Sequence, residues 1–588
     1  MRWEAKTMRF GKSSSNGALL RGDVRRCWPV PFVYAAIWII ALPLRLNAQY
    51  GLNARSTVLD TMEAVVILAF FFGCAMAMAL MSYLMNSRAT GLMHSLPVTR
   101  RSQFFTHFAA GFGMFTAANV LIFVLSVLVT LGGGVPWAAL GWWLLAAELT
   151  GFFFLSLGFF SAILTGWLLA VPAVYLILNF GVWVITMLLR ALGSIFYWGY
   201  SPGPLPAAVE WLTPTVKLCA ILWEHSDYTP ASYGVAAGHQ MNTGALPVML
   251  IYAAVGVLLL ALGSFLYRIR RSEAAGDAVA HRGLRPVVGA VGALTGGLAL
   301  GLVIYEILDG ENRSMVTVCV VIMTALCYFT IEMLLKKSFR VFKSGWIRAA
   351  LVCAAAAAVC VCVSQDLTGY QKRVPDPGAV QGVQNVTGRG YYEMLTDAET
   401  IEAVAALHQA IVTEGEGDAT DPWRSFHFTY AMKSGAVVNR HYGVYVKEGS
   451  AIHEAANRVL NCPEVQWKQI FGGKDGKADA PGETPAFRGG YVSVFSGEEQ
   501  FIQISAEQAR TLYEALAADV LMGRNTHDIL DEERECLWVE IELESADGRN
   551  DIHLWSQEAQ LEKTCTQTLH VLTELGFTEE QLIGSANW

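Results

Sequence analysis

Residues 62–85 read MEAVVILAFFFGCAMAMALMSYLM, and Glu63 is the only charged side chain among these 24 positions. An α-helix of this length is about 36 Å long, whereas the hydrocarbon core of a bilayer is about 30 Å thick. Apolar residues surround the helix instead of forming one stripe, which is the pattern of a helix in lipid or deep in a core. The stretch therefore predicts a membrane-spanning helix.

Eight further segments share this character, so the sequence predicts an α-helical multi-pass membrane domain with about nine spans. Each segment has the roughly 20 apolar residues that a bilayer crossing needs. The fourth and fifth spans are nearly fused around Gly166 and Trp167. The predicted spans are Pro29–Leu46, Met62–Met85, Phe105–Leu131, Leu140–Thr165, Leu168–Leu189, Leu246–Tyr267, Pro286–Leu308, Met315–Leu335 and Trp346–Ser364.

Composition separates the chain into two parts with different surroundings. The 588 residues are 54% hydrophobic and 16% charged, whereas about 25% charged is usual in soluble domains. Residues 1–364 hold 25 Lys and Arg against 14 Asp and Glu, and residues 365–588 hold 17 against 36. A disordered chain and a disulfide-stapled mini-protein are therefore excluded, and the composition argues against a single soluble domain. We expect the first part in a bilayer and the second in water.

The basic residues predict how the spans are oriented, because Lys and Arg gather in short cytoplasmic connections. With a cytoplasmic N-terminus, every cytoplasmic connection long enough to judge is basic, and the outer connections carry few basic residues. An odd number of spans then places residues 365–588 outside the cytoplasm. The cytoplasmic basic residues are Arg21, Arg25, Arg26, Arg88, Arg100, Arg101, Arg268, Arg270, Arg271, Arg282, Arg285, Lys336, Lys337, Arg340, Lys343 and Arg348.

The first 28 residues are too long and too polar to be the leading region of a signal peptide. Apolar residues such as Leu20 and Val24 alternate there with cations such as Arg21 and Arg25. This pattern predicts a leader helix that lies in the cytoplasmic membrane interface, with its cations near anionic lipid headgroups. A flexible basic leader is the alternative.

Nucleotide, metal and other catalytic motifs are missing from the sequence. A P-loop needs Gly-x-x-x-x-Gly-Lys-Ser/Thr after a strand, so that backbone N–H groups surround a phosphate. Gly11-Lys12-Ser13 resembles the end of that motif, but Lys6 stands where the first glycine belongs. Neither the eleven cysteines nor the histidines of the second part have metal-ligand spacing. The sequence therefore predicts no cofactor, no metal and no enzyme activity of its own.

The connection between the second and third spans is the most specific segment of the membrane part. Pro97 favours the start of a new helix, and apolar residues lie beside arginines. A short, rigid, basic and apolar element of this kind suits a groove on a cytoplasmic partner. A merely solvated basic loop is the alternative. The candidate docking residues are Arg88, Leu92, Met93, Leu96, Pro97, Arg100 and Arg101.

Glu148 lies inside the fourth predicted span, where an ionisable group is costly unless it is paired. Such residues mark functional sites by default. Two roles stay open: a hydrogen bond that packs helices together, and a substrate or gating role.

The order of spans and loops over about the first 270 residues resembles the permease subunit of an ABC-2 type transporter, of the kind found in Gram-positive bacteria. In that family an interfacial helix leads into a six-span core, a coupling helix follows span two, and re-entrant helices precede span six. The matching stretches are Asn16-Gly17, Arg25-Arg26 and Trp28-Pro29 for the leader, Leu96–Arg100 for the coupling helix, Gly193–Ala245 for the re-entrant segment and Arg268–Arg271 for the end of the core.

The resemblance implies an organisation, partners and a function. The regions are a leader (1–28), a six-span ABC-2-like core (29–271), three additional spans (272–364) and an extracytoplasmic domain (365–588). The implied partners are a separate cytoplasmic ATPase, a second permease chain of the same or a sister type, and membrane lipid, with no nucleic acid. The chain would export or extract an amphipathic molecule or peptide in the cell membrane. The alternatives are an ion-coupled secondary transporter, and a membrane sensor or anchor that displays the outer domain.

Residues 365–588 are predicted to form a mixed α+β domain. Helical periodicity over 398–412 is followed by a hairpin around Lys433-Ser434-Gly435, and a helix over 506–522 by a hairpin around residues 546–549. This order indicates a diverged repeat. Seven histidines are interpreted as scattered surface residues: His408, His427, His441, His453, His527, His553 and His570.

Overall fold

A computed structural model describes the chain in residues 17–48, 54–223 and 242–585, apart from several short gaps. It divides into two compact units, of which one contains residues up to 189 together with 205–360 and the other contains 190–204 with 361–588. The gaps after residue 242 are 309, 311, 368, 385, 387–393, 472–484, 495–499, 532–534, 538, 546–551 and 556–560.

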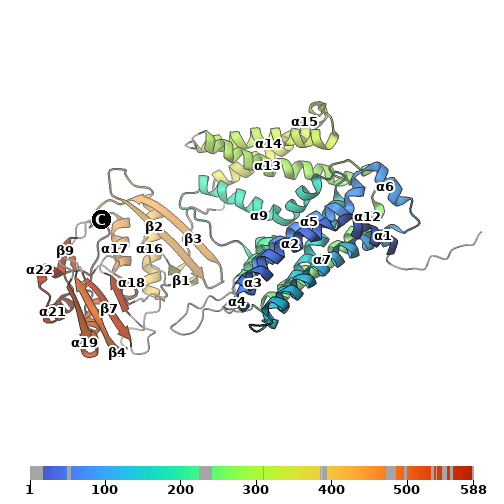
Figure 1. Ribbon diagram of the computed structural model, residues 1–588. Coiled ribbons are helices and arrows are strands. Elements are labelled where there is room, and N and C mark those ends of the chain that lie inside the picture. The colour runs from blue at the N-terminus through green and yellow to red at the C-terminus, as the bar shows by residue number, and fades with distance from the viewer. Residues whose placement is uncertain are drawn as a thin grey trace, which may run out of the picture. The chain divides into compact units, whose positions relative to one another are not determined.

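Nine helices among the described residues are long and apolar enough to cross a membrane, so all nine predicted spans are confirmed as helices (Figure 1). Their ends lie within five residues of the predicted ends, except that the second begins eight residues earlier, at Ala54, and the fifth ends seven residues later, at Phe196. The elements are α2 (Pro29–Ile39) with η1 (Ile40–Leu44) and α3 (Arg45–Ala48), α4 (Ala54–Leu59) with α5 (Met62–Met81) and η2 (Ser82–Met85), α7 (Arg100–Thr130), α8 (Trp137–Leu164), α9 (Ala170–Phe196), α12 (Ala245–Ile269), α13 (Arg285–Ile307), α14 (Arg313–Lys336) and α15 (Phe342–Ser364).

Helix α8 is the most enclosed of the nine, and glycines bring α5 against it. A Cβ atom at Gly73 would lie 2.6 Å from the backbone carbon of Phe154, and one at Gly158 would lie 2.6 Å from the Gly73 oxygen. Without a hydrophobic drive between helices in lipid, such close backbone packing is a main source of association. The two glycines therefore fix the α5–α8 pair at the centre of the bundle.

Helices α13 and α14 pack in the same way. Gly297 and Gly301 are four residues apart on one face of α13, and a side chain at either would collide with Thr324 or Val320 of α14. This is the Gly-x-x-x-Gly spacing that lets membrane helices approach closely. Ala293 of α13, Tyr328 of α14 and Ala349 of α15 share a small apolar cluster, so the last three long helices form one group.

Three shorter helices belong to the first unit: α1 (Gly17–Cys27), α10 (Ala207–Trp211) and α11 (Pro214–Trp223). Helix α1 exposes its arginines and buries Asp23. Leu218 and Leu222 of α11 are buried in the core of the unit, and the Tyr252 hydroxyl donates to the Trp211 oxygen (2.9 Å). Residues 224–241 of the predicted re-entrant segment lie outside the described residues.

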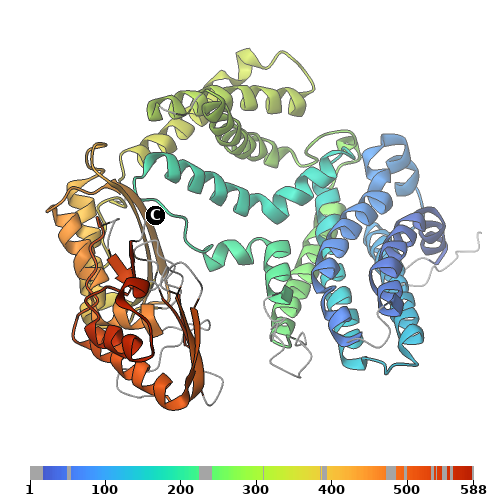
Figure 2. The ribbon, with the colours of Figure 1, turned by 60° about the vertical axis from the view of Figure 1, so that its left-hand side comes forward.

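The second unit contains two main antiparallel sheets covered by helices (Figures 1 and 2), and its predicted hairpins and helices are present. The sheet orders are β1-β2-β3 and β5-β4-β7-β8, and a small β6-β9 pair is separate. The elements are β1 (Val380–Gln384), α16 (Ala398–Glu414), β2 (Trp423–Met432), β3 (Val437–Tyr445), α17 (Ala451–Leu460), α18 (Pro463–Phe471), β4 (Phe487–Val494), β5 (Gln500–Ser505), α19 (Ala506–Leu521), β6 (Glu535–Leu537), β7 (Val539–Ser545), β8 (Ile552–Trp555), α21 (Thr566–Glu574), α22 (Glu579–Leu582) and β9 (Ile583–Ser585).

The two sheets have the same element order, as the repeated pattern in the sequence indicates. The first runs β1, α16, β2, β3, α17. The second runs β4, α19, β7, β8, α21, with the additional strands β5 before α19 and β6 before β7. In each, the first strand pairs with the first strand of the following hairpin. An antiparallel bridge from Leu395 to Val383 occupies the place that β5 has beside β4. Each half has its own apolar core, so the second unit contains two similar subdomains.

The connection after α9 is built into the first of these subdomains. The Tyr197 ring stacks on Tyr370 at 5.2 Å between centroids, and the Trp198 ring packs against Tyr442 at 4.9 Å. The Gly199 oxygen accepts a hydrogen bond from the His441 amide (3.3 Å). Residues 197–200 are therefore an extra edge of the β1–β3 sheet, although nearly 180 residues of chain separate them from its first strand.

Candidate functional site

The loop between the second and third spans forms a helix and a turn with capped ends. In α6 (Ser87–His94) the Asn86 side chain accepts from the Arg88 amide (3.0 Å), and at the start of α7 Thr99 accepts from the Ser102 amide (3.2 Å). Such caps satisfy backbone N–H groups that have no partner within the helix. The Thr90 hydroxyl donates to the Tyr83 oxygen (2.8 Å) and ties α6 back to the bundle. The loop is therefore a defined structural element.

One face of this loop is attached to the end of α12. The Arg100 guanidinium donates to the backbone oxygens of Arg268 (3.2 Å) and Arg270 (2.9 Å). The side-chain Nε2 of Gln103 donates to the Met93 backbone oxygen (3.1 Å), and the side-chain Oε1 of Gln103 accepts from the Tyr267 hydroxyl (2.9 Å). Movement of the loop is thereby linked to movement of α12.

His94 lies within this attachment, beside the Arg100 guanidinium. Its Nδ1 is 3.4 Å from Arg100 Nη2. Burial lowers the pKa of His94, and the positive charges of Arg100 and Arg270 lower it further. The imidazole therefore accepts from the guanidinium without adding a charge.

The opposite face of the loop is exposed. Leu92 is 69% exposed and Leu96 is 38% exposed. Arg88, Pro97 and Arg101 are exposed beside them. Of the seven residues predicted to dock a partner, these five form an outward apolar and basic surface, which we call the loop face. The other two, Met93 and Arg100, point into the protein.

Arg270 joins three helix ends at the same side of the bundle. Its guanidinium is buried and donates to the backbone oxygens of Ala162 (3.1 Å) and Ile163 (2.9 Å) in α8 and of Leu84 (3.1 Å). These oxygens lie in the last turns of their helices, where backbone C=O groups have no partner within the helix. In the sequence Arg270 is one of several neighbouring basic residues. Its position directly after a predicted span is the only sequence signal that it connects helix ends.

Glu148 is held between two neighbouring helices. Its Oε1 accepts from Asn119 (2.9 Å) and its Oε2 from Thr116 (2.7 Å), both in α7. The Tyr34 hydroxyl of α2 donates to the Asn119 oxygen (2.9 Å) and extends the network. The Glu148 residue is half-buried. These hydrogen bonds join α8 to α7, as a packing role needs. The packing role and the substrate or gating role both remain predictions.

A second buried acidic group fixes the leader helix. Asp23 of α1 accepts a hydrogen bond of 2.6 Å from Nδ1 of His107 in α7, and both side chains are buried. The sequence pattern of α1 suggests a helix that faces lipid, and it gives no sign that His107 is a partner. Residues 1–16, including the Gly11-Lys12-Ser13 stretch, lie outside the described residues.

Several histidines of the second unit are not on the surface, which corrects the sequence-based interpretation. His408 is fully buried, with its two ring nitrogens at 3.0 Å from the Tyr430 hydroxyl and 2.9 Å from the Tyr442 hydroxyl. Burial lowers its pKa to about 3, helped by the charge of Arg440. His527 is also buried. These positions are set by strand register and cannot be read from spacing in the sequence.

His427 and His441 are paired across β2 and β3 with their rings stacked at 3.9 Å between centroids. Both Nε2 atoms lie within 3.3 Å of the Ser425 hydroxyl. Within the described residues no group of three or more His, Cys, Asp and Glu side chains is placed to hold a metal ion. The two histidines are therefore interpreted as a cross-strand pair on one face of the β1–β3 sheet.

No family model, curated protein or solved structure matches the chain. Function must therefore be argued from the geometry.

Proposed function

We propose that this chain is the membrane-spanning permease subunit of an ABC transporter of the ABC-2 type, driven by a separate ATPase subunit. The observation that carries the proposal is the loop face, on which exposed leucines are flanked by arginines along α6, the turn after it and the start of α7. Exposed apolar residues with a polar rim are typical of a protein interface. A docking element of this kind is what an external ATPase requires.

The contacts behind the loop face supply a route for mechanical coupling. Arg100 and Gln103 fix the loop to the end of α12, and Arg270 fixes the same end to α8. Packed helices move as rigid bodies between discrete arrangements. A push on the loop by a closing ATPase is therefore transmitted to α8 and α12 as a tilt.

The remaining parts of the proposal follow from the spans and the charge distribution. The chain lies in the cell membrane with its N-terminus in the cytoplasm and residues 365–588 outside. It pairs with a second permease chain, and the transported molecule is an amphipathic compound or peptide that is exported or extracted from the membrane. The excess of basic residues in 1–364 and of acidic residues in 365–588 supports this orientation.

Glu148 favours an ion-coupled secondary transporter as a second candidate. Proton or cation coupling needs an ionisable group within the membrane. Glu148 has this character and stays partly accessible beside Asn119 and Thr116. The two candidates differ in their energy source, so transport that continues without ATP and stops in a Glu148→Gln variant supports the secondary transporter.

Purification from the native membrane tests the permease proposal. The tagged chain is extracted in mild detergent, co-eluting ATP hydrolysis is measured, and peptides with a P-loop sequence are identified by mass spectrometry. We expect an ATPase to follow the wild-type chain. Leu92→Asp and Arg101→Glu should lower its retention about tenfold or more, because charge changes at the centre of an interface cost 2 kcal/mol or more.

Arg268→Glu is the matched control, since it reverses an exposed charge at the same end of the bundle outside the loop face. Arg100 is unsuitable for this test because it holds the loop in place. Equal retention of the ATPase by the Leu92→Asp and Arg268→Glu variants would contradict docking through the loop face, and the absence of any P-loop protein would contradict the permease proposal.

A further inference from the structure

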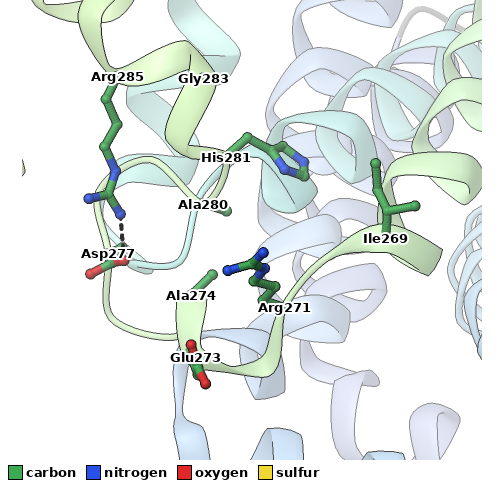
Figure 3. A pocket seen from close by; sticks show the side chains of 9 residues that line it. All are labelled: Ile269, Arg271, Glu273, Ala274, Asp277, Ala280, His281, Gly283 and Arg285. Carbon is green, nitrogen blue, oxygen red and sulfur yellow. Dashed lines mark hydrogen bonds and ion pairs between the residues drawn. The ribbon is translucent and has the colours of Figure 1, made fainter.

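The connection between α12 and α13 encloses a hollow of about 320 Å³ that the proposed function does not use (Figure 3). Arg271, Asp277, His281 and Arg285 line it. Binding pockets for small ligands begin at about this volume. The hollow lies between the end of α12 and the start of α13, two helices long enough to cross a membrane.

The walls of this hollow are held in place by backbone hydrogen bonds. The Gly166 amide donates to the Asp277 oxygen (2.8 Å), and the Gly276 amide donates to the Gly166 oxygen (2.6 Å). The Ala280 amide donates to the Leu164 oxygen (2.8 Å). A Cβ atom at Gly166 would overlap the Ala274 oxygen, so the close approach requires glycine. The connection is thus a fixed wall against the α8–α9 turn.

The acidic group inside the hollow is already neutralised. Asp277 accepts from Arg285 (2.7 Å) and from Lys337 (2.9 Å), and these two cations hold its pKa below the ordinary value despite partial burial. Glu273, the other carboxylate of the lining, is exposed at the rim. Asp277 therefore binds Arg285 and Lys337, and among the described residues neither carboxylate of the lining pairs with Arg271 or His281.

Three residues of the lining, the exposed Arg271 and the partly buried His281 and Arg285, carry nitrogen atoms without a hydrogen bond among the described residues. The Arg271 guanidinium points into it in Figure 3, and no hydrogen bond or ion pair is present for it in the described part of the chain. His281 Nε2 and Arg285 Nε are buried polar atoms without a hydrogen bond. An unsatisfied buried polar group costs roughly 1–3 kcal/mol, so its persistence calls for a ligand.

The geometry points to a phosphate group as that ligand, and we propose that the hollow formed by Arg271, His281 and Arg285 is a phosphate-binding site. Guanidinium groups match phosphate oxygens with paired hydrogen bonds. The hollow also lies at the N-terminus of α13, a helix of 23 residues whose dipole favours an anion there. Two sources present this chemistry at a membrane surface: the headgroup of an anionic phospholipid, and free phosphate.

Binding to the purified full-length chain tests the site. Native mass spectrometry after titration with phosphatidylglycerol measures lipid binding, and calorimetry with inorganic phosphate measures the free anion. Arg271→Gln is expected to weaken binding about tenfold or more, since it removes charge-assisted hydrogen bonds. Arg271→Lys should recover part of the loss, because it restores the charge without the planar fork.

Arg268→Gln is the matched control, with the same loss of charge one turn earlier at an exposed position outside the hollow. Binding of phosphatidylglycerol that depends on Arg271 but not on Arg268 supports a lipid source, and the same pattern with inorganic phosphate supports a soluble source. Either result confirms the site. Failure of both probes to bind, or an equal effect of the two variants, overturns it. Thermal unfolding of each variant verifies that it is folded.

Discussion

Arg100 shows how a single residue of the loop acts within the protein. Its guanidinium covers the Arg268 and Arg270 oxygens at the end of α12, where backbone C=O groups have no partner within the helix. Its neighbour Arg101 is exposed and lies over the Phe105 ring. Two adjacent arginines thus have different roles, one inside the protein and one on the loop face.

We therefore expect Arg100→Gln to lower the stability of the first unit and Arg101→Gln to leave that stability nearly unchanged. Hydrogen bonds to a charged group contribute roughly 1.5–3 kcal/mol, so the loss at Arg100 should be about 2 kcal/mol. Thermal unfolding in detergent measures the difference. Equal stability of the two variants would show that the Arg100 contacts to α12 contribute nothing.

His408 makes the second unit sensitive to acid. Its folded pKa of about 3 lies below the value of about 6.5 expected in the unfolded chain, so the unfolded state binds a proton first as the pH falls. The contribution of His408 to the free energy of unfolding is fully present above about pH 6.5, and it is lost progressively as the pH falls from there toward 3. Between pH 7.5 and pH 5 the expected loss is about 2 kcal/mol.

The His408→Gln variant checks this expectation. Its stability should change less between pH 7.5 and pH 5 than that of the wild-type chain, by about the same 2 kcal/mol. Unfolding of the second unit is followed in the full-length chain at both pH values. His570→Gln is the control, because His570 is exposed on α21 and should leave the pH dependence unchanged. An identical pH dependence in wild type and His408→Gln would refute the assignment.

At the scale of elements, the connection after α9 behaves as part of the β1–β3 subdomain. Gly199 adopts a positive φ of 73°, and a side chain there would collide with the Tyr442 ring. The Arg440 guanidinium lies 3.6 Å from the centre of the Tyr370 ring and donates to the Tyr370 oxygen (3.1 Å). These contacts connect the end of the fifth span to the domain that follows the ninth.

Gly199→Ala is accordingly expected to destabilise the second unit by about 3 kcal/mol, combining the cost of a left-handed backbone with that of overpacking. Gly203→Ala is the matched control, since the nearest atom to its new Cβ would be 3.5 Å away. Thermal unfolding measures stability, and limited proteolysis within residues 190–204 reports detachment of the connection. Similar behaviour of both variants would contradict the attachment.

How much of these elements can be predicted from sequence depends on whether the signal is local. The nine long helices of the described residues follow from runs of apolar residues, and the β2–β3 and β7–β8 hairpins of the second unit follow from alternation and turn residues. The loop between spans two and three is identifiable from Pro97 and its basic neighbours. The inward role of Arg100 depends on α12, which is about 170 residues away, so no local pattern contains it.

The same reason explains the other features that sequence reasoning missed. Gly73 and Gly158 read as ordinary small residues until α5 and α8 are placed together. His107 and Asn119 are buried partners of acidic groups on other helices. In each case the contacting residue is distant in the sequence. One sequence shows which residue types are present, but it does not show which of them contact each other.

At the scale of the whole molecule, long-range contacts constrain how many helices cross the membrane. Residues 197–200 follow the fifth span and pack on Tyr370, which follows the ninth. Four spans lie between them, and an even number returns the chain to the same side. Arg100 before the third span and Arg270 after the sixth are likewise separated by four spans. If any one of those helices did not cross, the contacting partners would lie on opposite sides of a bilayer.

Labelling of single introduced cysteines tests this topology. Ser434, in the turn between β2 and β3, and Ser95, in the loop after α6, are both exposed. A membrane-impermeant maleimide should label Ser434→Cys in intact cells and should label Ser95→Cys only after the membrane is opened. The wild-type chain gives the background from native thiols such as the exposed Cys362. Labelling of Ser95→Cys in intact cells would reverse the orientation. Labelling of both positions would place them on the same side of the membrane and would contradict seven crossings between them.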